Sequence, residues 1–246
     1  MKHRILTIVG IIGVFSLGSL GAIWAQAFLM PFFSSHSSFQ EWGFVRDWNN
    51  RTTVVREVLE VVIRTDEQVQ RVAARAEGMV VGLESRSGSL IIGGSGFVVT
   101  SDGFLLTLAS QVPQGYKVWV YLKEGVDPVL GEVLKRDIQK NLAIVKIDKR
   151  DLQTTGFALD DSVGAGAPVV LVAKSVEAGS LVTIVNQGSI RTRDKDVVRT
   201  NIFDKSTLGG SPLLNLEGNI VGMSMFEPSG RLVAIPASVL RAFSGF

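Results

Sequence analysis

Hydrophobic and polar residues follow three patterns in turn along this chain. No Asp, Glu, Lys or Arg occurs between Ile5 and Gln40, and most of that stretch is apolar. A short segment near residue 70 repeats its apolar residues with the period of an α-helix. From residue 79 onward, apolar residues alternate with polar ones or form short runs between turn residues, which is typical of β-strands. The pattern predicts an apolar N-terminal segment, one short helix and an all-β domain.

The N-terminal segment is long enough to span a membrane. Its apolar run Ile5–Met30 contains 26 residues, and about 20 residues suffice for a helix to cross a bilayer. Lys2 and Arg4 precede the run, so the positive-inside rule places the N-terminus in the cytoplasm. We therefore expect residues 1–33 to form a single-pass anchor that contacts the membrane through residues 5–30.

A cleaved signal peptide is the alternative for this segment. Ala25-Gln26-Ala27 has the form of a cleavage site, and cleavage would follow Ala27. The anchor is favoured because the apolar stretch before that site is longer than a usual signal-peptide core and continues beyond it. Residues 34–64 are expected to form a juxtamembrane stalk.

The helical segment opens the domain that we place at residues 65–246. Thr65-Asp66-Glu67-Gln68 matches a capping box, in which the fourth residue reaches back to the first. Apolar residues then follow at the spacing of one helix face: Val69, Val72, Ala73 and Ala76. We predict a short amphipathic helix that covers the mouth of a barrel.

The β-rich part divides into two sets of strands on either side of the polar link Asp148–Thr155. The first set is predicted at Met79–Glu84, Ser89–Thr100, Phe104–Ala109, Lys117–Leu122, Val129–Lys135 and Leu142–Ile147. The second is predicted at Pro168–Ala173, Leu181–Gln187, Val197–Phe203, Leu213–Leu216, Asn219–Phe226 and Leu232–Ile235. Many short strands with regular turns predict a sandwich or barrels. Two sets of similar size fit two barrels, at about 79–150 and 156–236, with a closing helix at 236–244.

Composition narrows the classes of partner. The sequence pI is about 9.0, but Lys2 and Arg4 supply the whole net charge of +2, because the other 23 basic residues balance 23 acidic ones. A neutral domain gives no electrostatic footprint for nucleic acid, so no nucleic-acid partner is expected. The chain has no cysteine, which excludes a disulfide scaffold and suits a bacterial exported protein. No cofactor and no metal site are predicted.

Several short motifs, in order and at regular spacing, carry a family resemblance between about Met79 and Val239. They are Gly94-Ser95-Gly96-Phe97, Asp102-Gly103-Phe104-Leu105-Leu106-Thr107, Asn141-Leu142-Ala143-Ile144-Val145-Lys146-Ile147, Pro212-Leu213-Leu214-Asn215 and Ala234-Ile235-Pro236. Together they resemble the protease domain of the HtrA-type trypsin-like serine proteases. The resemblance implies an all-β, chymotrypsin-like double β-barrel with short flanking helices. It also implies a peptide-reading PDZ module after the protease domain, which we do not expect in this chain because the sequence ends at Phe246.

The residues of this chain depart from the family pattern at all three catalytic positions. The resemblance assigns the catalytic histidine to Ser110, the aspartate to Asn141 and the nucleophilic serine to Gly209. The chain contains two histidines, His3 and His36, and both precede the folded domain. Acyl transfer by a serine needs an imidazole to take and return its proton. No catalytic residue is therefore expected, and the chain is expected to be a pseudoenzyme.

Relocated catalytic residues are the alternative that keeps an active serine endopeptidase. Ser206 and Ser211 flank the vacant nucleophile position, and Lys205 or Lys146 would have to serve as the base. We disfavour this interpretation because attack requires reacting atoms about 3–3.5 Å apart, and a shift of two residues displaces the hydroxyl by more than that tolerance.

Two further features come from the resemblance. The family builds its oxyanion hole from backbone N–H groups at the positions of Thr207 and Gly209, and Thr207 replaces a usual glycine. The strand Gly222-Met223-Ser224-Met225-Phe226 corresponds to the one that pairs with an extended peptide.

The sequence therefore predicts a catalytically inactive, HtrA-like pseudoprotease in the bacterial cytoplasmic membrane, with its domain outside the cytoplasm. Its expected partners are extended peptide segments or a protein partner, which includes pairing with an active homologue. A membrane-anchored assembly module, for which the family suggests homotrimers, is the third interpretation.

Overall fold

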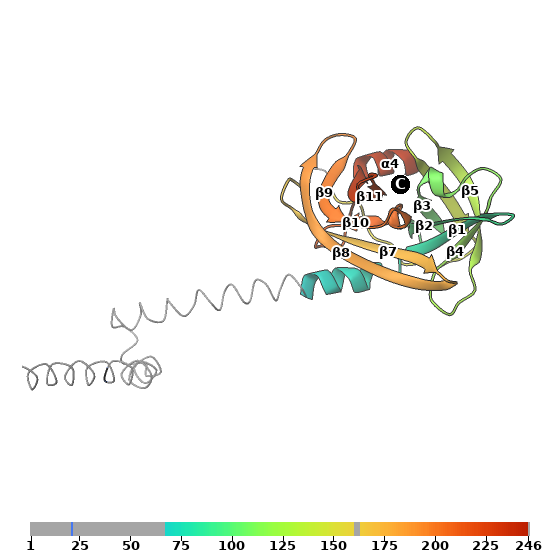
Figure 1. Cartoon of the computed structure of the whole chain (residues 1–246), viewed down its shortest axis with the longest axis horizontal. Helices are drawn as coiled ribbons and strands as arrows, with labels where there is room; N and C mark the ends of the chain where they lie inside the picture. Colours follow the sequence, from blue (N-terminus) through green and yellow to red (C-terminus); the bar gives the residue numbers. More distant parts are fainter. Residues whose placement is uncertain (1–20, 22–66, 160–162, 246) are drawn as a thin grey trace, which may run out of the picture. The chain divides into compact units, whose positions relative to one another are not determined.

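The computed structural model describes residue 21, residues 67–159 and residues 163–245 (Figure 1). Apart from Gly21, the predicted anchor, the stalk and the first two residues of the capping box lie outside the described residues. Among the residues that the structure does describe, no helix is long and apolar enough to cross a membrane. The helices and strands of the domain belong to the unit Asp66–Phe246.

The helix described at residues 67–76 packs one face on the domain core. Val72 and Ala76 are 4% and 3% exposed, and Val69 and Ala73 pack against the same cluster. These are the four residues that the helical period selects, so the predicted face of the helix is the buried one.

Six strands close the first barrel in the order β1-β2-β3-β6-β5-β4. Their bounds are β1 Val80–Ser87, β2 Leu90–Val98, β3 Phe104–Thr107, β4 Lys117–Tyr121, β5 Val129–Asp137 and β6 Leu142–Ile147. Every neighbouring pair is antiparallel, and β1 closes the barrel by pairing with β4 from Gly82↔Tyr121 to Arg86↔Lys117. The segment Ser101-Asp102-Gly103 lies in the turn that joins β2 to β3, and Gly103 adopts φ +102°.

The second barrel closes in the order β10-β11-β12-β9-β8-β7. Its strands are β7 Pro168–Glu177, β8 Ser180–Arg193, β9 Val198–Phe203, β10 Pro212–Leu214, β11 Ile220–Phe226 and β12 Arg231–Pro236. Helix α4, Ala237–Ser244, follows β12 directly. The all-β double barrel expected from the sequence is therefore the observed architecture.

The β7–β8 hairpin is longer than the hydrophobic pattern predicts. The two strands pair without a break from Pro168↔Ser189 to Glu177↔Ser180, and β7 packs against β1 and β2 of the first barrel. The added length carries the hairpin to the other barrel, where the Lys174 Nζ donates to the carbonyl of Leu122 at 2.7 Å.

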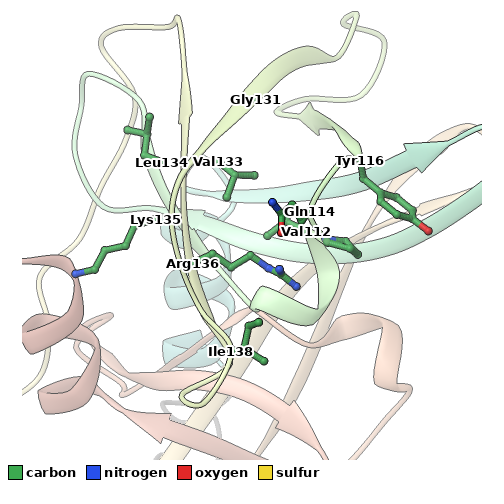
Figure 2. Close-up of a pocket in the computed structure, with 11 residues that line it drawn as sticks. Val112, Gln114, Tyr116, Gly131, Val133, Leu134, Lys135, Arg136 and Ile138 are labelled. Atoms are coloured by element: carbon green, nitrogen blue, oxygen red, sulfur yellow. The ribbon is translucent and has the colours of Figure 1, made fainter.

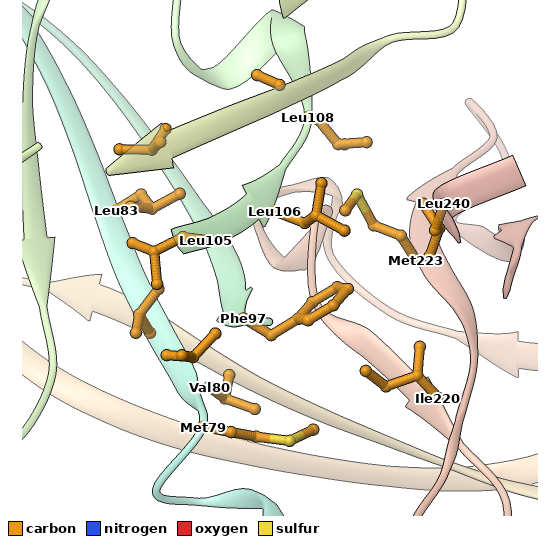
Figure 3. Close-up of a cluster of buried hydrophobic side chains, with 14 of the residues drawn as sticks. Met79, Val80, Leu83, Phe97, Leu105, Leu106, Leu108, Ile220, Met223 and Leu240 are labelled. Carbon is orange, nitrogen blue, oxygen red and sulfur yellow. The ribbon is translucent and has the colours of Figure 1, made fainter. Parts of the chain in front are cut away.

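One apolar cluster spans both barrels (Figure 3). First-barrel residues such as Leu106 and Phe97 pack with Ile220, Met223 and Leu240 of the second barrel and α4. Because the barrels share this core, the loops on either side of their junction are held in fixed relation, and the candidate site lies among these loops.

Candidate functional site

Three short segments meet at the junction of the barrels and carry the positions that the resemblance assigns to the triad. Ser110 lies in the 3₁₀ turn η3, Ala109–Gln111, which follows β3. Asn141 lies in the turn between β5 and β6. Gly209 follows the 3₁₀ turn η5, Ser206–Leu208, which leads into β10.

Asn141 joins the first two segments and contacts the second barrel. Its Oδ1 accepts the backbone N–H of Ser110 at 2.9 Å, and its carbonyl accepts the N–H of Ala109 at 3.2 Å. Its Nδ2 lies 3.9 Å from the Sδ of Met225 on β11. The backbone of Asn141 has φ 54°, a left-handed conformation that Asn tolerates better than most residues. Asn141 therefore positions the turn that carries Ser110.

Gly209 is buried, and both its backbone groups have partners within the protein. Its N–H donates to the carbonyl of Ser206 at 3.0 Å, which closes the η5 turn. Its carbonyl accepts the N–H of Ser95 at 3.1 Å and the Nε2 of Gln111 at 2.6 Å. A backbone donor stabilises an oxyanion only if it lies about 2.7–3.1 Å from the developing charge. In this conformation the Gly209 N–H bonds inside its own turn and is not presented to a ligand.

Gln111 holds this loop, and the sequence analysis did not identify it. Its side chain is 6% exposed, its Oε1 lies 2.9 Å from the Thr107 hydroxyl and its Nε2 binds Gly209. A Cβ added at Gly94 would lie 2.3 Å from the Gln111 Cδ, so the amide occupies the space that this glycine leaves. No motif marks Gln111; its position directly after Ser110 is the only signal in the sequence.

The two serines considered as relocated nucleophiles differ in accessibility. Ser211 is 0% exposed, and its hydroxyl donates to the carbonyl of Leu208 at 2.6 Å. Ser206 is exposed. A buried hydroxyl that already donates a hydrogen bond is poorly placed to attack a substrate.

The lysines considered as bases are bound elsewhere. The Lys146 Nζ donates to the carbonyls of Asp102 and Ile147, at 2.8 and 2.7 Å. Lys205 forms an ion pair with Glu177 at 3.8 Å. Neither amine contacts Ser206 or Ser211 within the described residues. Because His3 and His36 lie outside the described residues, the described part of the chain also contains no imidazole.

The strand proposed to bind peptide leaves part of one edge free. β11 pairs with β12 from Gly222↔Pro236 to Phe226↔Leu232, but its last partner on β10 is Pro212, opposite Met223. The next residue, Ser224, exchanges backbone hydrogen bonds with the Gly210–Ser211 loop, at 2.8 Å in each direction. Beyond Ser224, no described strand pairs with this edge, and Met225 and Phe226 are half-buried along it.

No group of three or more His, Cys, Asp or Glu that would hold a metal ion occurs among the described residues. Around the three assigned positions, the side chains described above are amides, hydroxyls and a thioether. This set donates and accepts hydrogen bonds but supplies no acid or base that titrates near neutral pH.

Known proteins resemble the domain in sequence and in fold. Residues 94–223 match the family of trypsin-like peptidase domains. A probable periplasmic serine endoprotease, DegP-like, of Rhizobium meliloti is 32% identical over 163 residues, which cover 60% of this chain and 32% of that protein. Serine protease HTRA1B of Danio rerio is 30% identical over 167 residues, or 62% of this chain and 34% of that protein.

A solved structure gives the same fold. The crystal structure of the serine endoprotease from Yersinia pestis matches 72% of this chain and 65% of its own, with a TM-score of 0.64 and 22% identity. The chain spans about a third of the length of the curated relatives that it matches.

Proposed function

Because the chain belongs to the family of trypsin-like peptidase domains, we propose that it is a catalytically inactive, HtrA-like member that acts by binding. It is a pseudoprotease whose ligands are extended peptide segments or a protein partner. The observation that carries this proposal is Gly209 at the position of the nucleophile, in a domain without histidine.

The chemical argument rests on three vacant positions. Gly209 offers no nucleophile, Ser110 cannot act as a base near neutral pH, and Asn141 has no imidazolium to stabilise. Loss of the serine or the histidine alone costs a serine protease about 10⁶ in turnover, and the losses are not additive. The hydrogen bond from the Gly209 N–H to Ser206 at 3.0 Å removes an oxyanion donor as well.

Binding survives this loss because it depends on different groups. The free edge of β11 beyond Ser224 offers backbone donors and acceptors to an added strand. Met225 and Phe226 border that edge and supply apolar contact. Peptide recognition by strand addition needs neither a nucleophile nor a base.

We further propose that residues 5–30 anchor the protein in the bacterial cytoplasmic membrane with the domain outside the cytoplasm. The uncharged run from Ile5 to Gln40 supports the anchor, and the similarity to a protein described as probably periplasmic supports the side of the membrane. Pairing with an active homologue, or self-association into trimers, is part of this proposal.

The proposal is tested by labelling the full-length chain, purified in mild detergent, with a fluorophosphonate that reacts with activated serines. We expect no covalent adduct in the intact mass under conditions that label trypsin completely. A stoichiometric adduct on Ser206, Ser211 or Ser110, or cleavage of casein that is abolished by Ser206→Ala or Ser211→Ala, would instead establish a serine endopeptidase with a relocated nucleophile.

A further inference from the structure

The first barrel carries a pocket of about 500 Å³ beside the candidate site (Figure 2). It lies between the segment that follows η3 and the strand β5. Its walls are partly apolar, from Val112, Val133 and Ile138, and partly polar, from Gln114, Tyr116 and Arg136. Ile138 is 72% exposed at the rim. The pocket therefore offers a ligand both an apolar surface and a positively charged side chain.

Arg136 is the cation available to a ligand in this pocket. Among the residues that the structure describes, the lining contains no Asp or Glu. The other lysine or arginine in the lining, Lys135, points away from the pocket, where its Nζ donates to the carbonyl of Phe243 at 2.7 Å and lies 4.4 Å from the centre of that ring. Arg136 extends toward Val112 and Gln114.

The guanidinium of Arg136 is only partly satisfied by the protein. Its one hydrogen bond to the described residues runs from Nε to the carbonyl of Ala109, at 3.2 Å. The neighbouring carboxylate, Asp137, accepts the backbone N–H of Lys140 at 3.0 Å. Both terminal nitrogens of Arg136 thus remain for a ligand, and the bond to Ala109 holds the guanidinium in place. A positioned planar guanidinium is suited to bidentate binding of a carboxylate.

We propose that this pocket is a subsite for an acidic residue of a bound peptide, with the carboxylate on Arg136 and apolar neighbours against Val133 and Ile138. A carboxylate suits the site better than a phosphate because Arg136 is the only cation of the described lining that faces the pocket, whereas a phosphate dianion is usually held by several donors. The subsite gives the binding function a preference for acidic segments.

This inference rests on the proposed peptide-binding function, and a chain of contacts connects the two sites. Arg136 binds the carbonyl of Ala109, which adjoins Ser110. Ser110 is held by Asn141, and Asn141 contacts Met225 on β11. The proposal therefore requires that a peptide paired with the free edge of β11 extends past this junction and places one of its side chains in the pocket.

The test uses the full-length chain in mild detergent and acetylated, amidated nonapeptides of alternating Val and Thr. In each peptide of the first series, one position carries Glu, and a twin peptide carries Gln at the same position. A third series carries Gln and ends in a free C-terminal carboxylate in place of the amide. Affinity is measured by isothermal titration calorimetry. We expect Glu at one position to bind at least ten-fold more tightly than its Gln twin, the size of a charged hydrogen-bonded contact. The third series distinguishes a side-chain carboxylate from a chain terminus.

Variants assign that preference to Arg136. Arg136→Gln is expected to remove the difference between the Glu and Gln peptides, and Arg136→Lys to keep only part of it, because Lys lacks the planar fork. Lys140→Gln is the matched control: it removes an exposed positive charge from the same β5–β6 turn, outside the pocket lining, and should keep the preference. As a check without a variant, the Glu peptide should protect Arg136 of the wild-type chain from phenylglyoxal.

The outcomes separate the two proposals. Equal affinity for the Glu and Gln series, or a preference that persists in Arg136→Gln, overturns the subsite and leaves peptide binding in place. Absence of binding by every peptide contradicts the binding function, and the subsite with it.

Discussion

The neighbouring positions Gly209 and Gly210 differ in whether they can accommodate a residue with a side chain. Gly209 has φ −56° and ψ 150°, which any L-residue adopts, and a Cβ there would lie 3.0 Å from the Leu108 Cδ1 and 3.2 Å from the carbonyl oxygen of Ser206. Gly210 has φ +86°, and a Cβ there would lie 2.2 Å from the carbonyl oxygen of Ser95. Only Gly210 is required by the geometry of the loop. The glycine at the nucleophile position is therefore not imposed by the backbone.

We predict that Gly209→Ala and Gly210→Ala differ sharply in stability. Gly209→Ala should change the free energy of unfolding by about 1 kcal/mol or less, whereas Gly210→Ala should lower it by more than about 3 kcal/mol through strain and a backbone clash. Urea denaturation of both variants measures the difference. Equal losses would mean that the loop around Gly209 is packed differently from the structure described above.

Sequence motifs located the residues at the junction but not the contacts between them. The positions of Ser110, Asn141 and Gly209 follow from short motifs, because a motif fixes a place along the chain. Gln111 and Arg136 matter through partners far away in sequence, Gly209 for the first and Ala109 for the second. A hydrogen bond between residues 98 positions apart leaves no periodic or local signal.

At the scale of the element, the β7–β8 hairpin shows where hydrophobic periodicity stops being informative. Alternation predicted Pro168–Ala173 and Leu181–Gln187, but the strands extend to Glu177 and Arg193. The added part of β7 contains Lys174 and Ser175, which are polar and yet 4% and 7% exposed. Backbone pairing with β8 continues through these polar residues. They are buried where β7 packs against the first barrel, so their burial leaves no apolar pattern in the sequence.

Lys174 makes the stability of this hairpin dependent on pH. Burial holds the pKa of Lys174 below its ordinary value of 10.5, and the Glu77 carboxylate partly opposes that shift. Between the lowered pKa of the folded state and 10.5, the unfolded chain binds more protons than the folded one. The contribution of Lys174 to stability therefore rises with pH across this window, and below the window it stays constant at its lowest value, because the amine is then protonated in both states.

We predict that Lys174→Met flattens this dependence. In the wild type, the free energy of unfolding relative to the variant should increase from neutral pH toward pH 10, as measured by urea denaturation at several pH values. Lys123→Met, which removes an exposed amine from the same face, is the control and should keep the wild-type slope. A constant difference between wild type and Lys174→Met would show that this amine does not titrate differently on unfolding.

At the scale of the whole molecule, the two barrels are joined by more than the chain between them. The largest apolar cluster draws residues from β1 to β6 and also from β7, β10, β11, β12 and α4. Polar contacts cross the junction at Gln111–Gly209, Lys174–Leu122 and Lys135–Phe243. A core shared in this way couples the unfolding of its parts, because opening one barrel exposes the apolar surface of the other.

Helix α4 provides the test of this coupling. Phe243 is 4% exposed, and both its ring and its carbonyl contact Lys135 of the first barrel. We predict that Phe243→Ala lowers the free energy of unfolding by about 3–5 kcal/mol and leaves one cooperative transition. Hydrogen exchange should accelerate together in β5 of the first barrel and β12 of the second. Ala242→Ser, at an exposed position of the same helix, should leave both strands protected. Faster exchange in β12 alone would mean that the barrels unfold separately, and the junction would then not hold its loops as one site.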